Sequence, residues 1–322
     1  MAQLYDWPLE TLEAYKPPLT RARDFDQFWQ SALAALEAVP ATEHMETKPY
    51  PAEVELTWVQ MRGADNVPVY GWYARPRHTA ARLPGIVLFH GYNYCYEGGV
   101  NEVATWALHG YATLALMVRG QSAPDVTPSP QEHVSGWMTQ GILSPATYYY
   151  RGVYLDAVRA VQWLSAHEEV WPRRVAVVGG SQGGGLALAA AALAAPWVAA
   201  VVAEYPFLAH FERAVDIAPE GPYGEIREYL RRHADPEVTT QVFNTLSYFD
   251  VMNLAPLVRA PVLMAVGLVD TITPPSTIFA TYNHLTVADR EIAVYRYFGH
   301  ENMPHFVIRK LEFLRHHLKE AR

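Results

Sequence analysis

A single serine stands among five glycines in "VAVVGGSQGGGLA", residues 175–187. Gly179, Ser181 and Gly183 satisfy the pattern G-x-S-x-G, in which a strand turns sharply into a helix and carries the serine at the apex. Glycine is expected on both sides because a side chain there would collide with the neighbouring strand or with the new helix. The helix N-terminus near the hydroxyl favours negative charge, so the pattern indicates a nucleophile whose reaction passes through an oxyanion.

Three other interpretations of this segment compete with a nucleophilic serine. A dinucleotide-binding loop needs glycine at the position of Ser181, and a phosphate-binding P-loop needs a lysine that is absent here. The third alternative is a glycine-rich turn that only lets an alanine-rich helix pack closely on a sheet. On the motif alone this alternative stays open, so partner residues for the serine must decide.

The residues that could assist Ser181 follow it in the expected order. A serine nucleophile needs a base and an acid that orients the base, and after this type of turn they come as Ser, Asp or Glu, His. Asp270 ends the apolar run "PVLMAVGLVD", and His300 ends the run "IAVYRYFGH". Both are expected at strand ends on the sheet edge that carries Ser181, which predicts a catalytic triad of Ser181, Asp270 and His300.

Two other acids and one metal motif compete with this interpretation. Glu204 lies inside an apolar strand pattern and Asp250 in an expected insertion, so Asp270 is favoured as the acid. "HENMPH" is close to the zinc motif H-E-x-x-H, but His300 and His305 are five residues apart, and a proline between them would break the helix that the motif requires. We therefore expect no metal and no cofactor.

Two backbone N–H groups are candidates for an oxyanion hole. Gln182 directly follows the nucleophile, which is the usual position of the first donor. "HGY" at the end of an earlier apolar run is similar to the loop that supplies the second donor, which would be the N–H of Tyr92. Tyr92, Tyr205 and Pro206 lie near strand ends and are candidates for the walls of a substrate pocket.

Six short apolar runs alternate with helical segments and predict the elements that position these residues. Nearly continuous apolar strands are buried on both faces, as in a parallel sheet covered by helices. Residues 148–167 predict a crossover helix, and residues 183–203 a buried helix followed by a strand. The sequence predicts an α/β fold with a mostly parallel central sheet and helices on both faces. Its strand runs are residues 85–91, 112–118, 175–180, 198–205, 261–270 and 292–300.

A long connection interrupts this alternation. About fifty residues separate the strand that ends near Tyr205 from the strand that starts near Pro261, which is more than a parallel crossover needs. We expect a helical insertion at about residues 206–256, a candidate lid. The whole chain, residues 1–322, is predicted to form one domain, with an N-terminal extension of about residues 1–50.

Composition argues against several classes of partner. The net charge of −8 opposes binding to nucleic acids and to anionic membrane surfaces, which need clustered lysine and arginine. Cys95 is the only cysteine, so no intrachain disulfide can form, which is typical of a reducing compartment. The N-terminal residues include acids and prolines where a secretory signal has basic and apolar residues, so we expect a cytoplasmic protein.

Many segments together resemble one enzyme family. The chain is similar to the acetyl xylan esterase and cephalosporin-C deacetylase family, carbohydrate esterase family seven. The resemblance covers nearly the whole chain, with one departure, because "SAPDVTPSP" follows Gln121 where the family has further glycine and serine. The segments that carry the resemblance are "RDFDQFWQSAL", "HGYNYCYEGG", "LMVRGQ", "GWMTQGI", "TYYYRGVYLDAVRAV", "GGSQGGGLALAAAAL", "EYPFLAHFERAVDI", "TLSYFDVMNLA", "GLVDTITPPSTIFATYNHL" and "YFGHENMPHF".

The resemblance implies an α/β-hydrolase fold and the hydrolysis of acetyl esters on short xylo-oligosaccharides and on cephalosporin C. It places the family's triad on Ser181, Asp270 and His300 and its oxyanion donors on Tyr92 and Gln182. It also implies a homohexamer and a tight acetyl pocket. Two alternatives remain at this point. A binding module without catalysis would usually lose a triad member, and a serine peptidase would use the same triad on the same fold.

Overall fold

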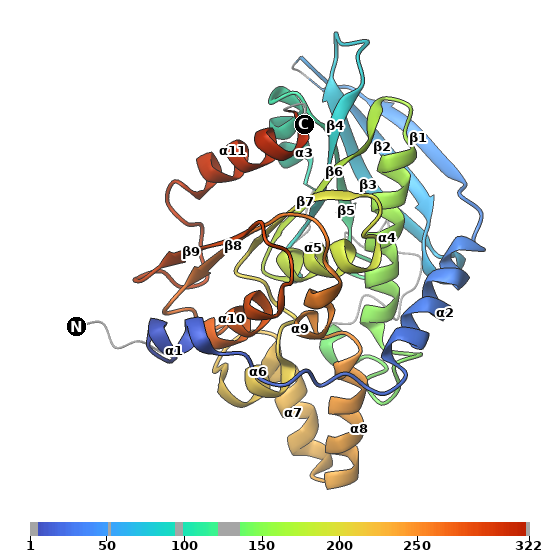
Figure 1. Ribbon diagram of the computed structural model, residues 1–322. Helices are drawn as coiled ribbons and strands as arrows, with labels where there is room; N and C mark the ends of the chain where they lie inside the picture. The colour runs from blue at the N-terminus through green and yellow to red at the C-terminus, as the bar shows by residue number, and fades with distance from the viewer. Residues whose placement is uncertain (1–5, 51–52, 94–98, 122–135, 320–322) are drawn as a thin grey trace.

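A nine-stranded sheet runs through the molecule with the strand order β1-β2-β3-β5-β4-β6-β7-β8-β9 (Figure 1). The computed structural model describes residues 6–50, 53–93, 99–121 and 136–319. Its strands are β1 (Glu43–Lys48), β2 (Val54–Arg62), β3 (Pro68–Pro76), β4 (Leu83–Phe89), β5 (Ala112–Met117), β6 (Val170–Gly180), β7 (Val198–Glu204), β8 (Val262–Gly267) and β9 (Arg290–Tyr295).

The six strands predicted from the sequence form the parallel part of the sheet. Strands β5, β4, β6, β7, β8 and β9 pair in parallel in that order. Every residue of β5 and β8 is buried, as their unbroken apolar runs predict. The prediction of a mostly parallel central sheet is confirmed.

Three antiparallel strands extend the sheet on one side and were not predicted. Strands β1, β2 and β3 pair antiparallel with one another, and β3 pairs antiparallel with β5. Strand β1 is polar and largely exposed, and β2 mostly alternates buried and half-buried residues, so neither has an unbroken apolar run. Strand β1 also lies inside the segment that was expected to be an N-terminal extension.

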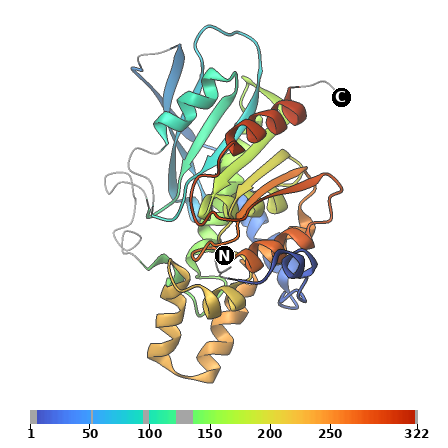
Figure 2. The ribbon, with the colours of Figure 1, turned by 90° about the vertical axis from the view of Figure 1, so that its left-hand side faces the viewer.

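Helices cover both faces of the sheet (Figures 1 and 2). Helices α3 and α11 pack on one face, and α4, α5 and α10 pack on the other. In β4, Ile86 and Leu88 belong to the core under α3 and α11, whereas Val87 belongs to the core under α4 and α5. The helices that pack on the sheet are α3 (Val100–Leu108), α4 (Tyr149–Ala166), α5 (Gln182–Leu193), α10 (Pro275–His284) and α11 (Phe306–Leu318).

Four helices occupy the long connection between β7 and β8, as the sequence predicts. They are α6 (Phe211–Ile217), α7 (Tyr223–His233), α8 (Pro236–Ser247) and α9 (Val251–Leu254). Helices α7 and α8 run side by side and project away from the sheet (Figure 2). The predicted crossover helix is α4, and the predicted pair of buried helix and strand is α5 and β7. No helix in the described ranges is long and apolar enough to cross a membrane.

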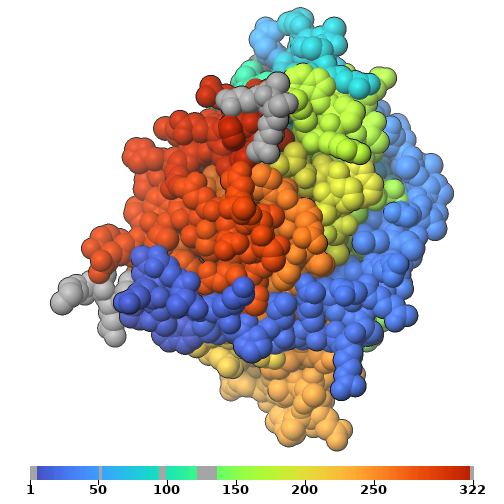
Figure 3. All heavy atoms as spheres, viewed as in Figure 1, coloured from blue at the N-terminus to red at the C-terminus, as the bar shows by residue number. Residues whose placement is uncertain are grey.

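The N-terminal residues lie against the surface of later parts of the chain (Figure 3). Asp6 accepts hydrogen bonds from Arg213 of α6 and from the N–H of Ser276 in α10, at 2.9 and 2.8 Å. The helices of this segment are α1 (Leu9–Ala14) and α2 (Phe25–Glu37). Arg159 of α4 donates to the carbonyl oxygens of Leu36 and Val39 at the end of α2.

Candidate active site

The turn between β6 and α5 has the geometry that the glycine pattern predicts. Ser181 stands between the two elements with φ 55° and ψ −121°, a strained conformation for a non-glycine residue. A Cβ at Gly179 would overlap the backbone of Gly183, and a Cβ at Gly183 would overlap the carbonyl oxygen of Phe89 in β4. Both glycines are therefore required by close backbone packing around the serine.

Ser181, His300 and Asp270 form one chain of hydrogen bonds. His300 Nε2 lies 2.9 Å from Ser181 Oγ, and His300 Nδ1 lies 2.9 Å from Asp270 Oδ2. Asp270 is completely buried, whereas the His300 side chain is 18% exposed. In this arrangement the imidazole can accept the serine proton while the carboxylate holds the N–H on the opposite nitrogen.

Asp270 and His300 lie beyond the strand ends rather than at them. Strand β8 ends at Gly267 and β9 at Tyr295, so loops carry both side chains to the site. The two loops bind each other, because the N–H of Val269 donates to the carbonyl oxygen of Phe298 at 3.2 Å. This pairing beyond the strand ends brings the acid and the histidine together.

Asp270 accepts three further hydrogen bonds from its own loop. The N–H groups of Ile272 and Thr273 donate to Oδ1, both at 2.8 Å. The Thr273 hydroxyl donates to Oδ2 at 2.8 Å and lies 3.2 Å from His300 Nδ1. The carboxylate thus has fixed partners on both oxygens, which compensates for its burial. Thr273 was not identified from the sequence.

The two proposed oxyanion donors come from two different segments of the chain. Gln182 is the first residue of α5, and Tyr92 lies in the loop after β4. Within the described part of the chain, neither backbone N–H has a hydrogen-bond acceptor, so both are available to a ligand.

A buried side-chain network connects these two donor segments. Gln182 and Gln121 exchange two hydrogen bonds between Nε2 and Oε1, both at 3.0 Å. Tyr150 of α4 donates to Gln182 Oε1 at 2.7 Å, and the N–H of Asn93 donates to Gln121 Oε1 at 2.9 Å. Gln121 and Tyr150 were not identified as site residues from the sequence, because nothing in their local sequence indicates these distant partners.

His90 sits where β4 meets the Tyr92 loop and is held in one tautomer. The N–H of Val118 donates to Nε2 at 3.0 Å, so the proton must be on Nδ1, which donates to the carbonyl oxygen of Gly91 at 2.7 Å. Desolvation lowers the pKa of His90 to about 4, although the bond to Gly91 acts in the opposite direction. His90 therefore stays neutral near pH 7.

The side chains of the predicted pocket residues have different surroundings. The Tyr92 hydroxyl donates to Glu225 of α7 at 2.7 Å, and burial raises the pKa of this carboxyl. The Tyr205 ring packs edge-on against His300, with 4.8 Å between ring centroids. Pro206 is buried close to Gly184, and the N–H of the adjacent Phe207 donates to the carbonyl oxygen of Ser181 at 2.9 Å.

The two rival acids have other partners. Glu204 ends β7 and pairs with Lys310 of α11, at 2.5 Å. Asp250 caps α9 and accepts N–H groups of His210, Phe211 and Met252, while burial raises its pKa to about 6. Neither carboxylate bonds His300.

A cleft of about 740 Å³ opens over Ser181 and His300. Tyr205 and Glu204 line it as well, and so do Glu301 and Asn302, the two residues after the histidine. Among the described residues, no group of three or more histidine, cysteine, aspartate or glutamate side chains could hold a metal ion. Cys95 and the loop directly after Gln121 lie outside the described residues.

The acetyl xylan esterase (AXE1) family matches residues 1–317 of the chain. The chain belongs to the acetyl xylan esterase family. An acetyl xylan esterase from Paenibacillus sp. R4 is 43% identical and superposes with a TM-score of 0.91, covering 97% of this chain and 100% of that chain. Acetyl xylan esterase 1 from Thermoanaerobacterium sp. JW/SL YS485 is 32% identical, with a TM-score of 0.89 over 98% and 100% of the two chains.

The acetyl esterase Axe7A of Xylanibacter ruminicola is a curated relative of this chain. It is 26% identical over 85% of this chain, and the match spans 62% of the length of that protein. Solved α/β hydrolases below 25% identity share the fold alone. The predicted α/β-hydrolase fold is confirmed.

Proposed function

We propose that this chain is a serine esterase that removes acetyl groups from acetylated xylo-oligosaccharides. The observation that carries this proposal is the chain of hydrogen bonds from Ser181 through His300 to the buried Asp270, with 2.9 Å at each step. Membership of the acetyl xylan esterase family supports the substrate class.

The first half of the proposed reaction forms an acetyl-enzyme. Ser181 Oγ attacks the ester carbonyl carbon while its proton moves to His300 Nε2, and Asp270 keeps the Nδ1–H in place. The carbonyl oxygen becomes an oxyanion that the N–H groups of Tyr92 and Gln182 stabilise. The bond from carbon to the sugar oxygen then breaks, and His300 returns the proton to that oxygen as the sugar leaves.

The second half releases acetate. His300 Nε2 accepts a proton from a water molecule, whose oxygen attacks the acetyl carbon bound to Ser181. The same two N–H groups hold the second oxyanion. The bond from carbon to Ser181 Oγ breaks, the imidazole returns the proton to Oγ, and the product leaves as acetic acid, which gives its remaining proton to water and becomes acetate. An imidazolium at His300 could accept no proton, so the reaction requires the neutral ring.

Several finer features belong to the same proposal. Tyr92, Tyr205 and Pro206 are proposed walls of a pocket that fits acetyl and disfavours longer acyl chains. The acetoxymethyl ester of cephalosporin C is a second proposed substrate, because it also carries an acetyl group on a small alcohol. Family membership further supports a homohexamer, which light scattering would test as a mass near six chains of 36.2 kDa.

The proposed organisation and location are tested separately. A single domain with an insertion at about residues 206–256 predicts one cooperative unfolding transition for the chain. A cytoplasmic location stays a prediction, which cell fractionation would check. Neither outcome changes the chemistry proposed at Ser181.

A rate series over acyl length tests the activity. Wild type should hydrolyse p-nitrophenyl acetate and acetylated xylotriose, with kcat/KM falling toward butyryl and octanoyl esters. The folded Ser181→Ala variant should lose activity by a factor of about 10³ or more, because triad members act as a unit. Near-normal turnover by that variant, or a preference for peptide anilides over acetyl esters, would contradict the proposal.

A further inference from the structure

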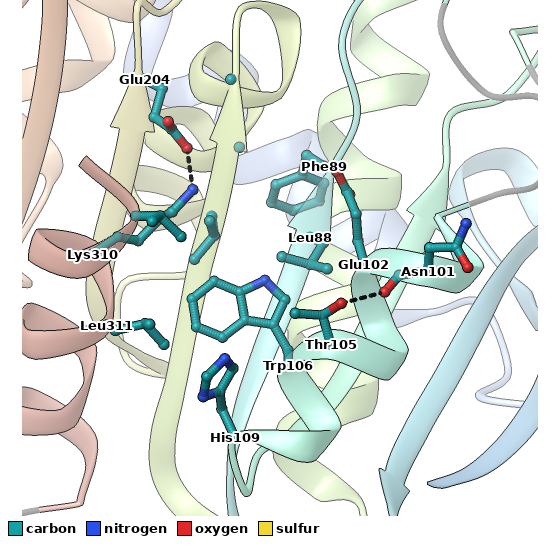
Figure 4. A pocket seen from close by; sticks show the side chains of 14 residues that line it. Leu88, Phe89, Asn101, Glu102, Thr105, Trp106, His109, Glu204, Lys310 and Leu311 are labelled. Atoms are coloured by element: carbon teal, nitrogen blue, oxygen red, sulfur yellow. Dashed lines mark hydrogen bonds and ion pairs between the residues drawn. The ribbon is translucent and has the colours of Figure 1, made fainter. Parts of the chain in front are cut away.

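A groove of about 290 Å³ runs between α3 and α11 on the sheet face opposite α4 and α5 (Figure 4). Strands β4, β6 and β7 form its floor, with Leu88 and Val178 both nearly buried there. In Figure 4 the indole of Trp106 lies across this floor, between Leu311 of α11 and Thr105 of α3. The groove is therefore built from two helices that the proposed chemistry does not use.

The groove is continuous with the cleft that contains Ser181 and His300. Six residues line both the cleft and the groove, and they lie where α3, α11 and the strand ends meet. A ligand that extends from the cleft past these residues enters the groove. The shared residues are Phe89, Asn101, Glu102, Gly180, Glu204 and Lys310.

The cleft lies on the side of the nucleophile where the sugar must be. In the proposed reaction, His300 Nε2 gives a proton to the departing sugar oxygen, so that oxygen must lie within hydrogen-bond distance of the imidazole. His300, Glu301 and Asn302 line the cleft, whereas Gln182 and Tyr92 do not. The alcohol half of the ester is therefore directed into the cleft, and the groove continues in the same direction.

The charges at the junction favour an uncharged ligand. Lys310 and Glu204 pair at 2.5 Å with side chains that are only 16% and 12% exposed. Glu102 lines the same junction and adds a second carboxylate. The junction therefore has two carboxylates, Glu204 and Glu102, and one cation, Lys310, which is already paired with Glu204. This charge balance disfavours an anionic ligand.

Neutral hydrogen-bonding groups and one aromatic ring complete the lining. Asn101 is exposed at the junction, and its side-chain amide has no partner among the described residues. Trp106 is 8% exposed, and its Nε1–H donates to no group in the described ranges. Apolar and aromatic walls with a few well-placed polar groups are typical of small-molecule sites, and this set matches the ring faces and hydroxyls of a sugar.

We propose that the groove between α3 and α11 is a subsite for the sugar ring next to the acetylated one. This rests on the proposed function, because it takes the acetylated sugar to occupy the cleft over Ser181. The neighbouring ring lies against the edge of Trp106, and its hydroxyls pair with the amide of Asn101 and with the Trp106 N–H. The enzyme then prefers acetylated oligosaccharides over acetylated single sugars.

The test compares two substrates that carry the same ester. The ratio of kcat/KM for acetylated xylotriose to kcat/KM for the acetylated methyl xyloside is measured in wild type, Asn101→Ala, Trp106→Phe and the matched control Leu108→Ala. Leu108 is on the same helix, is 64% exposed and lines neither cavity. We expect wild type and the control to share a ratio above one. Asn101→Ala and Trp106→Phe should each lower it by about threefold to tenfold, the worth of one neutral hydrogen bond.

A binding measurement separates this proposal from the proposed function. Unacetylated xylotriose is titrated into the Ser181→Ala protein, and calorimetry gives the dissociation constant. In the double variant Ser181→Ala/Asn101→Ala this constant should rise by a similar factor. Loss of all acetyl esterase activity in wild type would reject the proposed function, and this titration would still test the groove. Equal substrate ratios in all four proteins, or xylotriose binding that Asn101→Ala does not weaken, would overturn the subsite. Because Trp106 is nearly buried, the exposed Asn101 keeps the test valid if Trp106→Phe does not fold.

Discussion

Two hydrogen bonds join the side-chain amides of Gln121 and Gln182, because Nε2 of each residue donates to Oε1 of the other at 3.0 Å. Gln182 begins α5 and carries one proposed oxyanion donor. Gln121 also accepts the N–H of Asn93, the residue after the other donor, Tyr92. The pair therefore joins the two halves of the proposed oxyanion hole, and both amides are buried.

We expect Gln121→Ala to lower kcat by about tenfold with a small effect on KM, because the oxyanion exists only in the transition state. A trifluoromethyl ketone that forms a tetrahedral adduct should lose affinity by a similar factor. Gln241→Ala is the matched control, since Gln241 is an exposed glutamine whose amide donates to the carbonyl oxygen of Leu143 at 2.8 Å, away from the site. A fall in thermal stability with unchanged kcat would show that Gln121 has only a structural role.

Thr273→Val should lower kcat/KM by about tenfold, because it removes the hydroxyl that donates to Asp270 Oδ2 at 2.8 Å and leaves a buried carboxylate less satisfied. Thr273→Ser keeps the hydroxyl and should recover most of the activity. The measurement is kcat/KM for p-nitrophenyl acetate over a range of pH. If valine and serine behave alike, the hydroxyl does not support the acid.

Gly183→Ala should destabilise the fold by about 1–3 kcal/mol or more, because the new methyl group overlaps the carbonyl oxygen of Phe89. Gly224→Ala is the matched control in α7. Its Cβ would meet only Arg227 Nη2, at 3.7 Å, and removal of a helical glycine should stabilise by about 0.5–1 kcal/mol. Urea unfolding followed by circular dichroism measures both changes. Equal effects of the two substitutions would contradict the role assigned to close packing at the turn.

Acidification should destabilise the protein through His90 and His210. Desolvation lowers the pKa of each histidine from 6.5 to about 4 in the folded protein. The unfolded chain therefore binds more protons between these values, and this contribution to stability is present above pH 6.5 and lost as pH falls toward 4. Each histidine contributes a slope of at most about 1.4 kcal/mol per pH unit within that window.

The variant His90→Gln isolates one of these contributions. Its amide oxygen can accept the Val118 N–H, but it cannot titrate, so the free energy of unfolding should fall less steeply between pH 6.5 and 4 than in wild type. Urea unfolding at several pH values gives both slopes. Parallel curves for the two proteins would show that His90 does not stay neutral in the folded state.

The local pattern of the sequence determined the turn at Ser181 and the parallel strands. Glycines around a serine after an apolar run permit few backbone paths, and unbroken apolar runs between helices favour a buried parallel sheet. Asp270 and His300 were identifiable from chain order and from the apolar runs that precede them, although loops beyond the ends of β8 and β9 carry both side chains to Ser181. Strands β1 to β3 were not predicted. Strand β1 is polar, and β2 and β3 mostly alternate buried and half-buried residues, which is a weaker signal of a strand than an unbroken apolar run.

Only the tertiary structure decided which side chains meet beyond these local patterns. Gln121 follows β5, whereas Tyr150 lies in α4 and Gln182 in α5. Their contact therefore depends on the position of β4 between β5 and β6 and on the packing of α4 against α5. The same holds for the groove at Trp106, which lies between α3, packed on β3 and β5, and α11, packed on β6 and β7. Such contacts depend on strand order and helix packing across the whole chain, and short segments of sequence carry no record of either.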